Sequence, residues 1–119
     1  MMYALYQSLL DINNEGLNNV LNRHLRVHNK LIQGLKDINL DMLVNEESRL
    51  ISLNAVKIPK GIDDLKVRSI LLNDFDIEIG GGLGPFAGKV WRIGLMGHSA
   101  NEENVNNLLQ AFNDVLVKY

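Results

Sequence analysis

The chain has 119 residues, a formal net charge of −2, 46% hydrophobic residues and no cysteine. This length suits one domain with a modest core, and the near-neutral charge gives no reason to expect binding to nucleic acid or to an anionic membrane. Without cysteine there can be no disulfide, thiolate metal site or cysteine nucleophile, which fits a reducing, cytoplasmic environment. The N-terminus lacks the basic flank of a signal peptide, and no apolar run reaches the roughly 18 residues that cross a bilayer.

The first third of the chain is predicted to be helical. Residues 2–12 carry apolar side chains at helical spacing, Asn13 and Asn14 interrupt them, and a longer helix is predicted over about 15–38. Its apolar stripe comprises Leu17, Val20, Leu21, His24, Val27, Leu31, Leu35 and Ile38. We place His24 on the buried edge of this helix and His28 at its boundary. Although the two histidines are four residues apart, no acidic ligand lies near them in the sequence, so a metal site is not expected.

The rest of the chain alternates between strands and helices. The patterns predict, in order, an edge strand at 40–44, a strand at 51–58, a helix capped by Asp63, strands at 76–79 and 90–95, and a final helix starting at the capping box Ser99-Ala100-Asn101-Glu102. This order predicts an α+β fold, in which a small, mainly antiparallel sheet has helices packed on one face. Residues 1–14 have no obvious place in that layer, so we expect them to dock on another domain or chain.

The stretch 76–97 contains seven of the ten glycines and the only tryptophan. Two glycine motifs can be rejected there. A phosphate-binding P-loop ending at Gly88-Lys89 would need a glycine where Leu83 stands and a Ser or Thr where Val90 stands. The run 82–87 resembles a dinucleotide-binding fingerprint, but Pro85 and a strand follow it instead of a helix. Such a density of glycine marks tight turns or a close approach to the backbone.

Arg92 is the candidate functional residue in this stretch. In the strand at 90–95, alternation puts the large apolar residues on one face and Arg92 on the other, next to Gly94, which leaves room for a ligand. A guanidinium in this setting must be paired. It could form an internal ion pair with Asp76 or Glu78 on the preceding strand, or it could bind the carboxylate of a ligand through its planar fork.

These motifs together resemble the class V aminotransferases, with the alanine–glyoxylate (serine–pyruvate) subgroup as the nearest. The resemblance rests on Ile77-Glu78-Ile79-Gly80-Gly81-Gly82-Leu83-Gly84-Pro85, Gly88-Lys89-Val90-Trp91-Arg92-Ile93-Gly94-Leu95-Met96-Gly97, Asn101 with Glu103-Asn104-Val105, and the earlier Tyr3-Ala4-Leu5, Ser8-Leu9, Glu15-Gly16-Leu17 and Arg23-His24. It covers essentially the whole chain.

The resemblance implies a division of the chain and a role for Arg92. Residues 1–14 would be a helical segment leading from a missing large domain, and residues 15–119 the small C-terminal α+β domain. In this family the enzymes use pyridoxal 5′-phosphate, and the arginine matching Arg92 binds the substrate carboxylate. The family's Schiff-base lysine and other cofactor-binding residues lie upstream and have no counterpart here; Lys89 is in a different motif. We therefore expect no catalytic residue, metal or cofactor in this chain alone.

Three hypotheses for the function remain open at this stage. The chain could be a domain or fragment of an aminotransferase that moves an amino group from alanine or serine to glyoxylate or pyruvate. It could be a non-catalytic interaction module that kept the fold, or a small carboxylate-binding protein, although one arginine without a closed pocket gives little affinity. In each of the first two cases we expect association with the missing large domain or with itself, as a dimer or other homo-oligomer.

Overall fold

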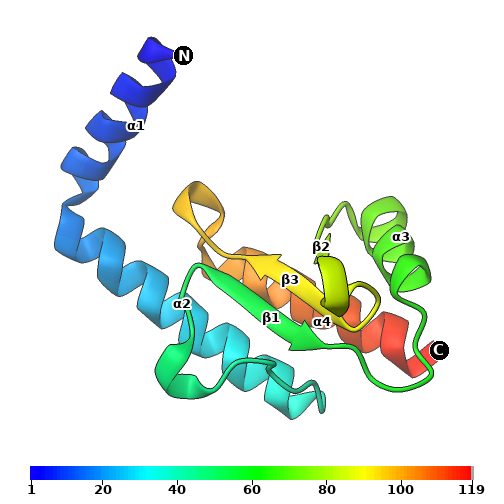
Figure 1. Ribbon diagram of the computed structural model, residues 1–119. Coiled ribbons are helices and arrows are strands. Elements are labelled where there is room, and N and C mark those ends of the chain that lie inside the picture. Colours follow the sequence, from blue (N-terminus) through cyan, green and yellow to red (C-terminus); the bar gives the residue numbers. More distant parts are fainter. Residues whose placement is uncertain (119) are drawn as a thin grey trace.

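A three-stranded antiparallel sheet with the strand order β1–β3–β2 organises the chain in the computed structural model, which describes residues 1–118 (Figure 1). Its strands are β1 (Leu53–Lys57), β2 (Gly80–Gly81) and β3 (Val90–Gly94). The central strand β3 pairs with β1 along its full length, from Val90 opposite Lys57 to Gly94 opposite Leu53. The much shorter β2 pairs only with the middle of β3.

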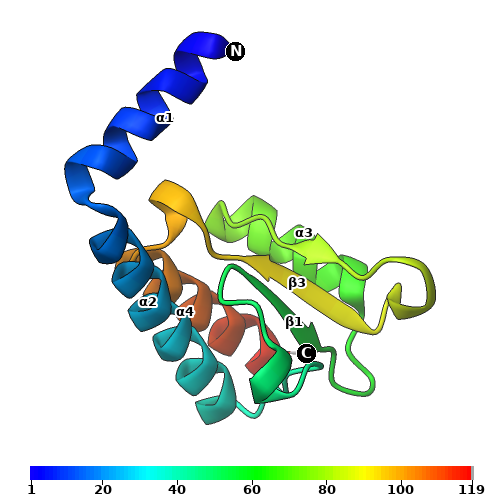
Figure 2. The ribbon, with the colours of Figure 1, turned by 60° about the vertical axis from the view of Figure 1, so that its left-hand side comes forward.

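Four helices accompany the sheet: α1 (Met2–Glu15), α2 (Leu17–Asp37), α3 (Asp64–Phe75) and α4 (Glu102–Lys118). Helices α2 and α4 run side by side across one face of the sheet, and α3 packs next to α4 (Figures 1 and 2). Helix α1 projects away from this layer and contacts α2. The predicted α+β fold is therefore confirmed. Among residues 1–118, no helix is long and apolar enough to cross a membrane.

The core lies between the sheet and the helices. Trp91 is fully buried, and its ring lies 5.2 Å from that of Phe112 on α4, measured between ring centroids. Ile93 and Leu95 are buried on the same face as Trp91, as the alternation of the strand predicts. Helix α2 contributes Val27, Leu31 and Leu35, and α3 contributes Val67 and Leu71.

The predicted strand at 76–79 is wrong, because the pairing with β3 starts only at Gly80. Asp76 adopts a left-handed conformation, with φ of 55°, that ends helix α3. The amide of Ile77 then donates to the carbonyl of Leu71, so the chain folds back over the end of that helix. Ile79 enters the core before the chain reaches β3. Asp76 and Glu78 are therefore exposed and outside the sheet.

The predicted edge strand at 40–44 is also shorter than expected. Only Met42 forms a bridge, opposite Val56, although the amide of Leu43 donates to the carbonyl of Ala55. The long helix begins at Leu17 and not at residue 15, because Gly16 adopts φ of 89° and separates α1 from α2. At the far end α2 stops at Asp37, close to the predicted boundary.

Of the two predicted N-terminal caps, the one at Asp63 is confirmed and the one at Ser99 is wrong. Asp63 caps α3, because its carboxylate accepts the amide of Lys66 at 2.8 Å. The predicted capping box at Ser99 is wrong, because Asn101 accepts the amide of Asn104 at 2.8 Å and α4 starts at Glu102. Ser99 belongs to the short 3₁₀ turn 97–99 that precedes the helix.

Helices α2 and α4 approach each other closely at Gly34. A Cβ atom at this position would lie 2.2 Å from Cδ1 of Leu109 and 3.1 Å from its Cγ. These distances are far shorter than van der Waals contact, so the side chain of Leu109 occupies the place of a side chain at residue 34. The glycine therefore lets the two helices pack tightly.

We predict that Gly34→Ala lowers the free energy of unfolding by about 1–2 kcal/mol, because overpacking outweighs the better helix propensity of alanine. In a Leu109→Ala background the same replacement should be neutral or stabilising, because the methyl group then has room. Urea unfolding of the four proteins in this cycle measures the coupling. An equal effect of Gly34→Ala in both backgrounds would contradict the proposed close packing.

The placement of the two helical histidines is the reverse of the prediction. His28 is buried with an exposed fraction of 7%, whereas His24 is half-buried. His28 lies near the buried Asn54 of β1, and neither Nδ1 of His28 nor Oδ1 of Asn54 has a hydrogen-bond partner within residues 1–118. Burial lowers the pKa of His28 below its ordinary value of 6.5, and the neighbouring Asn54 side chain acts in the opposite direction.

This lowered pKa predicts a pH dependence of stability. Below about pH 6.5 the unfolded chain binds a proton at His28 that the folded chain resists, so the free energy of unfolding should fall as the pH falls. His28→Gln should show a smaller decline than the parent between about pH 7 and pH 5. The matched control is His98→Gln at an exposed position. Denaturant unfolding at a series of pH values in this range measures the free energy of unfolding. The prediction fails if this free energy changes with pH equally in the parent, His28→Gln and His98→Gln.

Candidate functional site

Arg92 lies in the middle of the central strand and on the face of the sheet opposite Trp91. Its neighbours across the two strand pairs are Ala55 of β1 and Gly80 of β2. Both are small, so the guanidinium has space above the strands on either side. The helices cover the other face of the sheet, which leaves Arg92 half-buried and accessible.

The backbone of β2 sets the orientation of the Arg92 side chain. Its Nε donates a hydrogen bond of 2.7 Å to the carbonyl oxygen of Gly81. Its Nη2 lies 3.3 Å from the place that a Cβ atom would take at Gly80. The guanidinium thus lies across β2, with one of its donors used by the chain itself. Within residues 1–118, neither Nη1 nor Nη2 forms a hydrogen bond.

The internal ion pair considered for Arg92 is not present. Among residues 1–118 no carboxylate lies within 4.0 Å of its guanidinium, and the four ion pairs found there involve other residues. The reason is the path of residues 76–79, which puts Asp76 and Glu78 outside the sheet and not opposite Arg92. Above Gly94, the Cε atom of the exposed Met96 lies 3.4 Å from the place of a Cβ atom, which is an ordinary van der Waals contact.

A hollow of about 230 Å³ lies beside Arg92. Segment 42–50 and strand β1 form its other walls, and the lining includes Arg49 and Leu53. Arg49 brings a second guanidinium to this hollow, although its Nε already donates to the carbonyl of Val44 at 2.8 Å. Arg49 is not among the candidate residues that the sequence pattern indicates, because only the fold brings it beside Arg92. A larger hollow of about 630 Å³ lies between α4 and residues 75–79, and Arg92 does not line it.

The described residues do not fit pyridoxal phosphate on their own. A lysine that forms an imine with such a cofactor must lie in a pocket with the substrate site. The lysines here are exposed, apart from Lys30, which pairs with Glu102 at 3.3 Å, and no lysine lines either hollow. Nor do three His, Cys, Asp or Glu side chains of residues 1–118 come together as metal ligands.

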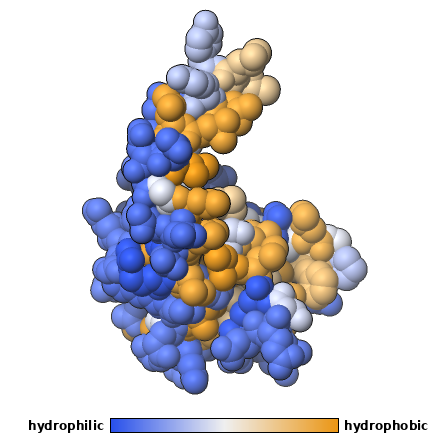
Figure 3. Space-filling model, turned by 90° about the vertical axis from the view of Figure 1, so that its left-hand side faces the viewer, coloured by the Kyte–Doolittle hydropathy of each residue, from blue (hydrophilic) through white to orange (hydrophobic). Residues whose placement is uncertain are grey.

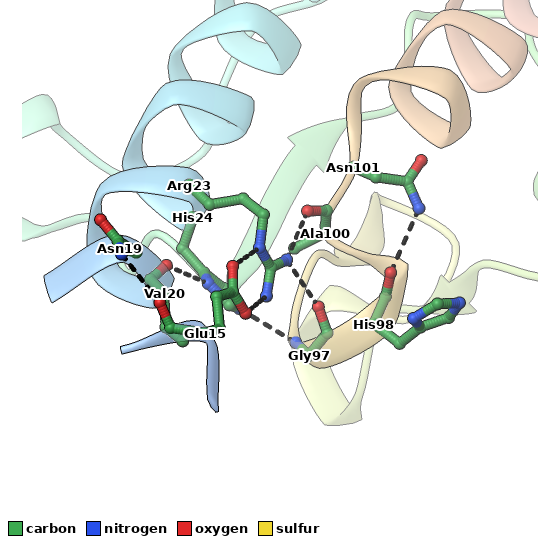
Figure 4. A network of polar contacts seen from close by, with 9 residues as sticks. All are labelled: Glu15, Asn19, Val20, Arg23, His24, Gly97, His98, Ala100 and Asn101. Atoms are coloured by element: carbon green, nitrogen blue, oxygen red, sulfur yellow. Dashed lines mark hydrogen bonds and ion pairs between the residues drawn. The ribbon is translucent and has the colours of Figure 1, made fainter. Parts of the chain in front are cut away.

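A network of polar contacts joins α1, α2 and the turn that follows β3 (Figure 4). Arg23 donates to both carboxylate oxygens of Glu15, at 2.6 and 3.0 Å, and to the carbonyls of Gly97 and Ala100. His24 accepts the amide of Gly97 at 3.0 Å, while its Nδ1 lies 2.7 Å from the carbonyl of Val20. The hydrogen bonds from Arg23 lower the pKa of Glu15. This network holds the base of α1 against the turn 97–100.

Helix α1 carries an apolar strip that no part of residues 1–118 covers. Apart from Leu10, which is half-buried, its large apolar side chains are at least 41% exposed, and no residue of α1 is buried. The strip continues onto the first turns of α2, and Figure 3 shows it as an orange band running from α1 down to the body of the domain. Its members are Met2, Tyr3, Leu5, Tyr6, Leu9, Ile12, Leu17, Leu21 and Leu25. An exposed apolar surface of this kind is typical of an interaction site.

Known proteins that resemble this chain are aminotransferases. The (S)-ureidoglycine–glyoxylate transaminase of Bacillus subtilis is 38% identical over 119 residues, which are 100% of this chain and 29% of that protein. The alanine–glyoxylate aminotransferase of Drosophila melanogaster is 37% identical over 117 residues, or 98% of this chain and 30% of that protein. The chain thus spans about 30% of the length of these curated relatives. No family model matches the sequence.

Solved structures give the same result. The alanine–glyoxylate aminotransferase of Nostoc sp. superimposes with a TM-score of 0.93 and 46% identity, over 96% of this chain and 30% of that one. The ureidoglycine–glyoxylate aminotransferase of Bacillus subtilis gives a TM-score of 0.94 and 38% identity, over 98% and 30% of the two chains. Both the sequence and the arrangement of the elements are therefore similar to those of a part of such enzymes.

Proposed function

Since this chain belongs to the class V aminotransferases, as a counterpart of their C-terminal domain, we propose that it supplies the substrate-binding arginine to an active site that a separate large domain completes. The observation that carries this proposal is the accessible guanidinium of Arg92, held by a backbone carbonyl and free of any carboxylate partner within residues 1–118. The substrate would be a small amino acid or oxo acid.

The orientation of Arg92 suits the recognition of a carboxylate. Because Nε is used by Gly81, the two terminal nitrogens Nη1 and Nη2 are the donors left for a ligand. Two parallel hydrogen bonds from this end of the fork match the two oxygens of a carboxylate, and an ionised pair of this geometry is stronger than a neutral hydrogen bond. Arg92 would thus bind and orient the carboxylate end of the substrate and leave its amino or oxo group for the chemistry.

The large domain would contribute everything else that the reaction needs. When bound there, pyridoxal phosphate would act as the electron sink for the transfer of the amino group. The apolar strip of α1 and α2 supports association with such a domain, because it would otherwise remain in contact with water. The two curated relatives both use glyoxylate and differ in the amino donor, so we propose glyoxylate or pyruvate as acceptor and alanine or serine as donor.

Reconstitution tests this division of labour. We would combine the chain with the large domain of the Bacillus subtilis relative and call the product the reconstituted enzyme. We expect transamination of glyoxylate only when both parts are present, and no visible absorbance band that survives dialysis when the chain alone is mixed with pyridoxal phosphate. Such a band in the chain alone would contradict the proposal. A stable complex without activity would instead favour the non-catalytic interaction module, and sedimentation would show whether the chain associates with itself.

Substitution of Arg92 tests the role of the guanidinium. Arg92→Lys keeps the charge but loses the planar fork, so kcat/KM of the reconstituted enzyme should fall about hundredfold, equivalent to about 3 kcal/mol. The thermal stability of the chain should change little, because no carboxylate partner in residues 1–118 is lost. The matched control is Arg26→Lys, at an exposed ion pair with Glu102. Unfolding of the Arg92 variant together with normal kcat/KM in its folded fraction would show a purely structural residue.

A further inference from the structure

Helix α3 carries Arg68, whose side chain lies against the face of strand β2 opposite to the one that Arg92 contacts. Arg68 donates from Nε and Nη2 to the two carboxylate oxygens of Asp64, at 2.8 and 3.1 Å. The Asp64 side chain has an exposed fraction of 12%, and that of Arg68 has 29%, so the pair is largely shielded from water. Hydrogen bonding to Asp64 raises the pKa of Arg68 above its ordinary value. The guanidinium therefore has a fixed charge and a fixed plane.

The plane of Arg68 lies directly over Gly81. A Cβ atom at residue 81 would be 3.1 Å from Nη2 of Arg68, 3.2 Å from its Cζ and 3.4 Å from its Nε. The place of a Cβ atom at Gly80 is filled in the same way by the guanidinium of Arg92, on the opposite side of the strand. Strand β2 is thus enclosed between two guanidinium groups, and the absence of side chains at both glycines allows this.

Asp64 links this arrangement to the central strand as well. Its Oδ1 atom accepts the indole N–H of Trp91 at 3.0 Å in addition to Nε of Arg68. Trp91 is the residue that pairs with Gly81 across β2 and β3, and it immediately precedes Arg92. Two routes therefore connect the Asp64–Arg68 pair to Arg92, through the backbone of Gly81 and through the neighbouring position of β3.

We infer that Arg68 is a positioning residue for Arg92, acting through the carbonyl of Gly81. Strand β2 has only two residues and lies at the edge of the sheet, where it pairs only with β3, so strand pairing contributes few hydrogen bonds to its position. Arg68 presses on Gly81 from that face, and Gly81 then presents its carbonyl oxygen to Nε of Arg92 at 2.7 Å. The role of Arg68 in substrate recognition rests on the proposed function of Arg92. The coupling between the positions of the two arginine side chains does not depend on that function.

Arg68→Lys tests this inference in the reconstituted enzyme. Lysine can still pair with Asp64, but it has no planar group to cover Gly81. We expect KM for glyoxylate and for alanine to rise about tenfold with a much smaller change in kcat, because the carboxylate site is misplaced by a fraction of an ångström. Arg26→Lys is the matched control, since it makes the same chemical change in an exposed ion pair. Equal kinetics of the Arg68 and Arg26 variants would overturn the inference.

A second variant separates positioning from general destabilisation. In Arg68→Ala the space above Gly81 is empty, and the added replacement Gly81→Ala would put a methyl group there. Gly81 does not have a positive φ angle, so alanine can adopt its backbone conformation. We expect the double variant to recover part of the KM lost by Arg68→Ala, even if its unfolding midpoint does not recover. If KM improves in the double variant only to the extent that the unfolding midpoint recovers, the role of Arg68 is structural and the inference is overturned.

Nuclear magnetic resonance of the full 119-residue chain gives a readout independent of activity. The Nε–H signal of Arg92, assigned by its loss in Arg92→Lys, should shift and exchange faster with water in Arg68→Lys, and should be unchanged in Arg26→Lys. If it moves while Arg92→Lys leaves kcat/KM normal, the coupling stands and the proposed function fails. If Arg92→Lys is inactive but the signal does not respond to Arg68→Lys, the proposed function stands and this inference fails.

Discussion

The alternation of side chains along strand β3 separates the buried core on one face of the sheet from the accessible Arg92 on the other. Trp91, Ile93 and Leu95 face the helices and are buried, while Arg92 faces the other way and stays accessible. Trp91 packs against Phe112 and so anchors this central strand on α4. Because neighbouring residues of a strand point to opposite faces, the same burial that stabilises the core also fixes the direction of Arg92. A slip of one residue would bury the guanidinium without a partner, at a large cost in free energy.

The glycines beside β3 allow close approaches that any side chain would block. At Gly82 a Cβ atom would lie 2.0 Å from the carbonyl oxygen of Phe86, so the loop can close on itself only with glycine there. At Gly80 and Gly81 the approaching groups are the guanidiniums of Arg92 and Arg68. At these three glycines the missing side chain lets the backbone lie against a carbonyl or a guanidinium. This makes the short strand β2 part of the site and not merely an edge of the sheet.

The outer part of the molecule has the character of an interface. Helix α1 buries none of its residues within the described chain, yet its base is held firmly by the bond between Glu15 and Arg23. Arg23 also contacts the carbonyls of the turn after β3, so the direction of α1 is tied to the region that carries Arg92. An exposed apolar strip on a helix with a defined direction is typical of a surface that packs against a partner. The relatives, of whose length this chain spans about 30%, have further chain that could supply such a partner.

The sequence by itself determined most of the helices, the strands β1 and β3, and the face of β3 on which Arg92 lies. Helical and strand periods are local properties, so α2, α4 and β3 could be predicted, and so could the cap at Asp63, whose partner is three residues away. Only the tertiary structure decided that Asp76 ends a helix in a left-handed conformation and leaves the sheet, and that Asn101 caps α4 in place of Ser99. The partner of Arg92 was equally hidden. It is the backbone carbonyl of Gly81, and because every residue has a carbonyl, only the fold brings this one within reach. The glycines of 76–97 indicate a close approach to the backbone, but only the fold shows that Arg68 is the group that approaches Gly81.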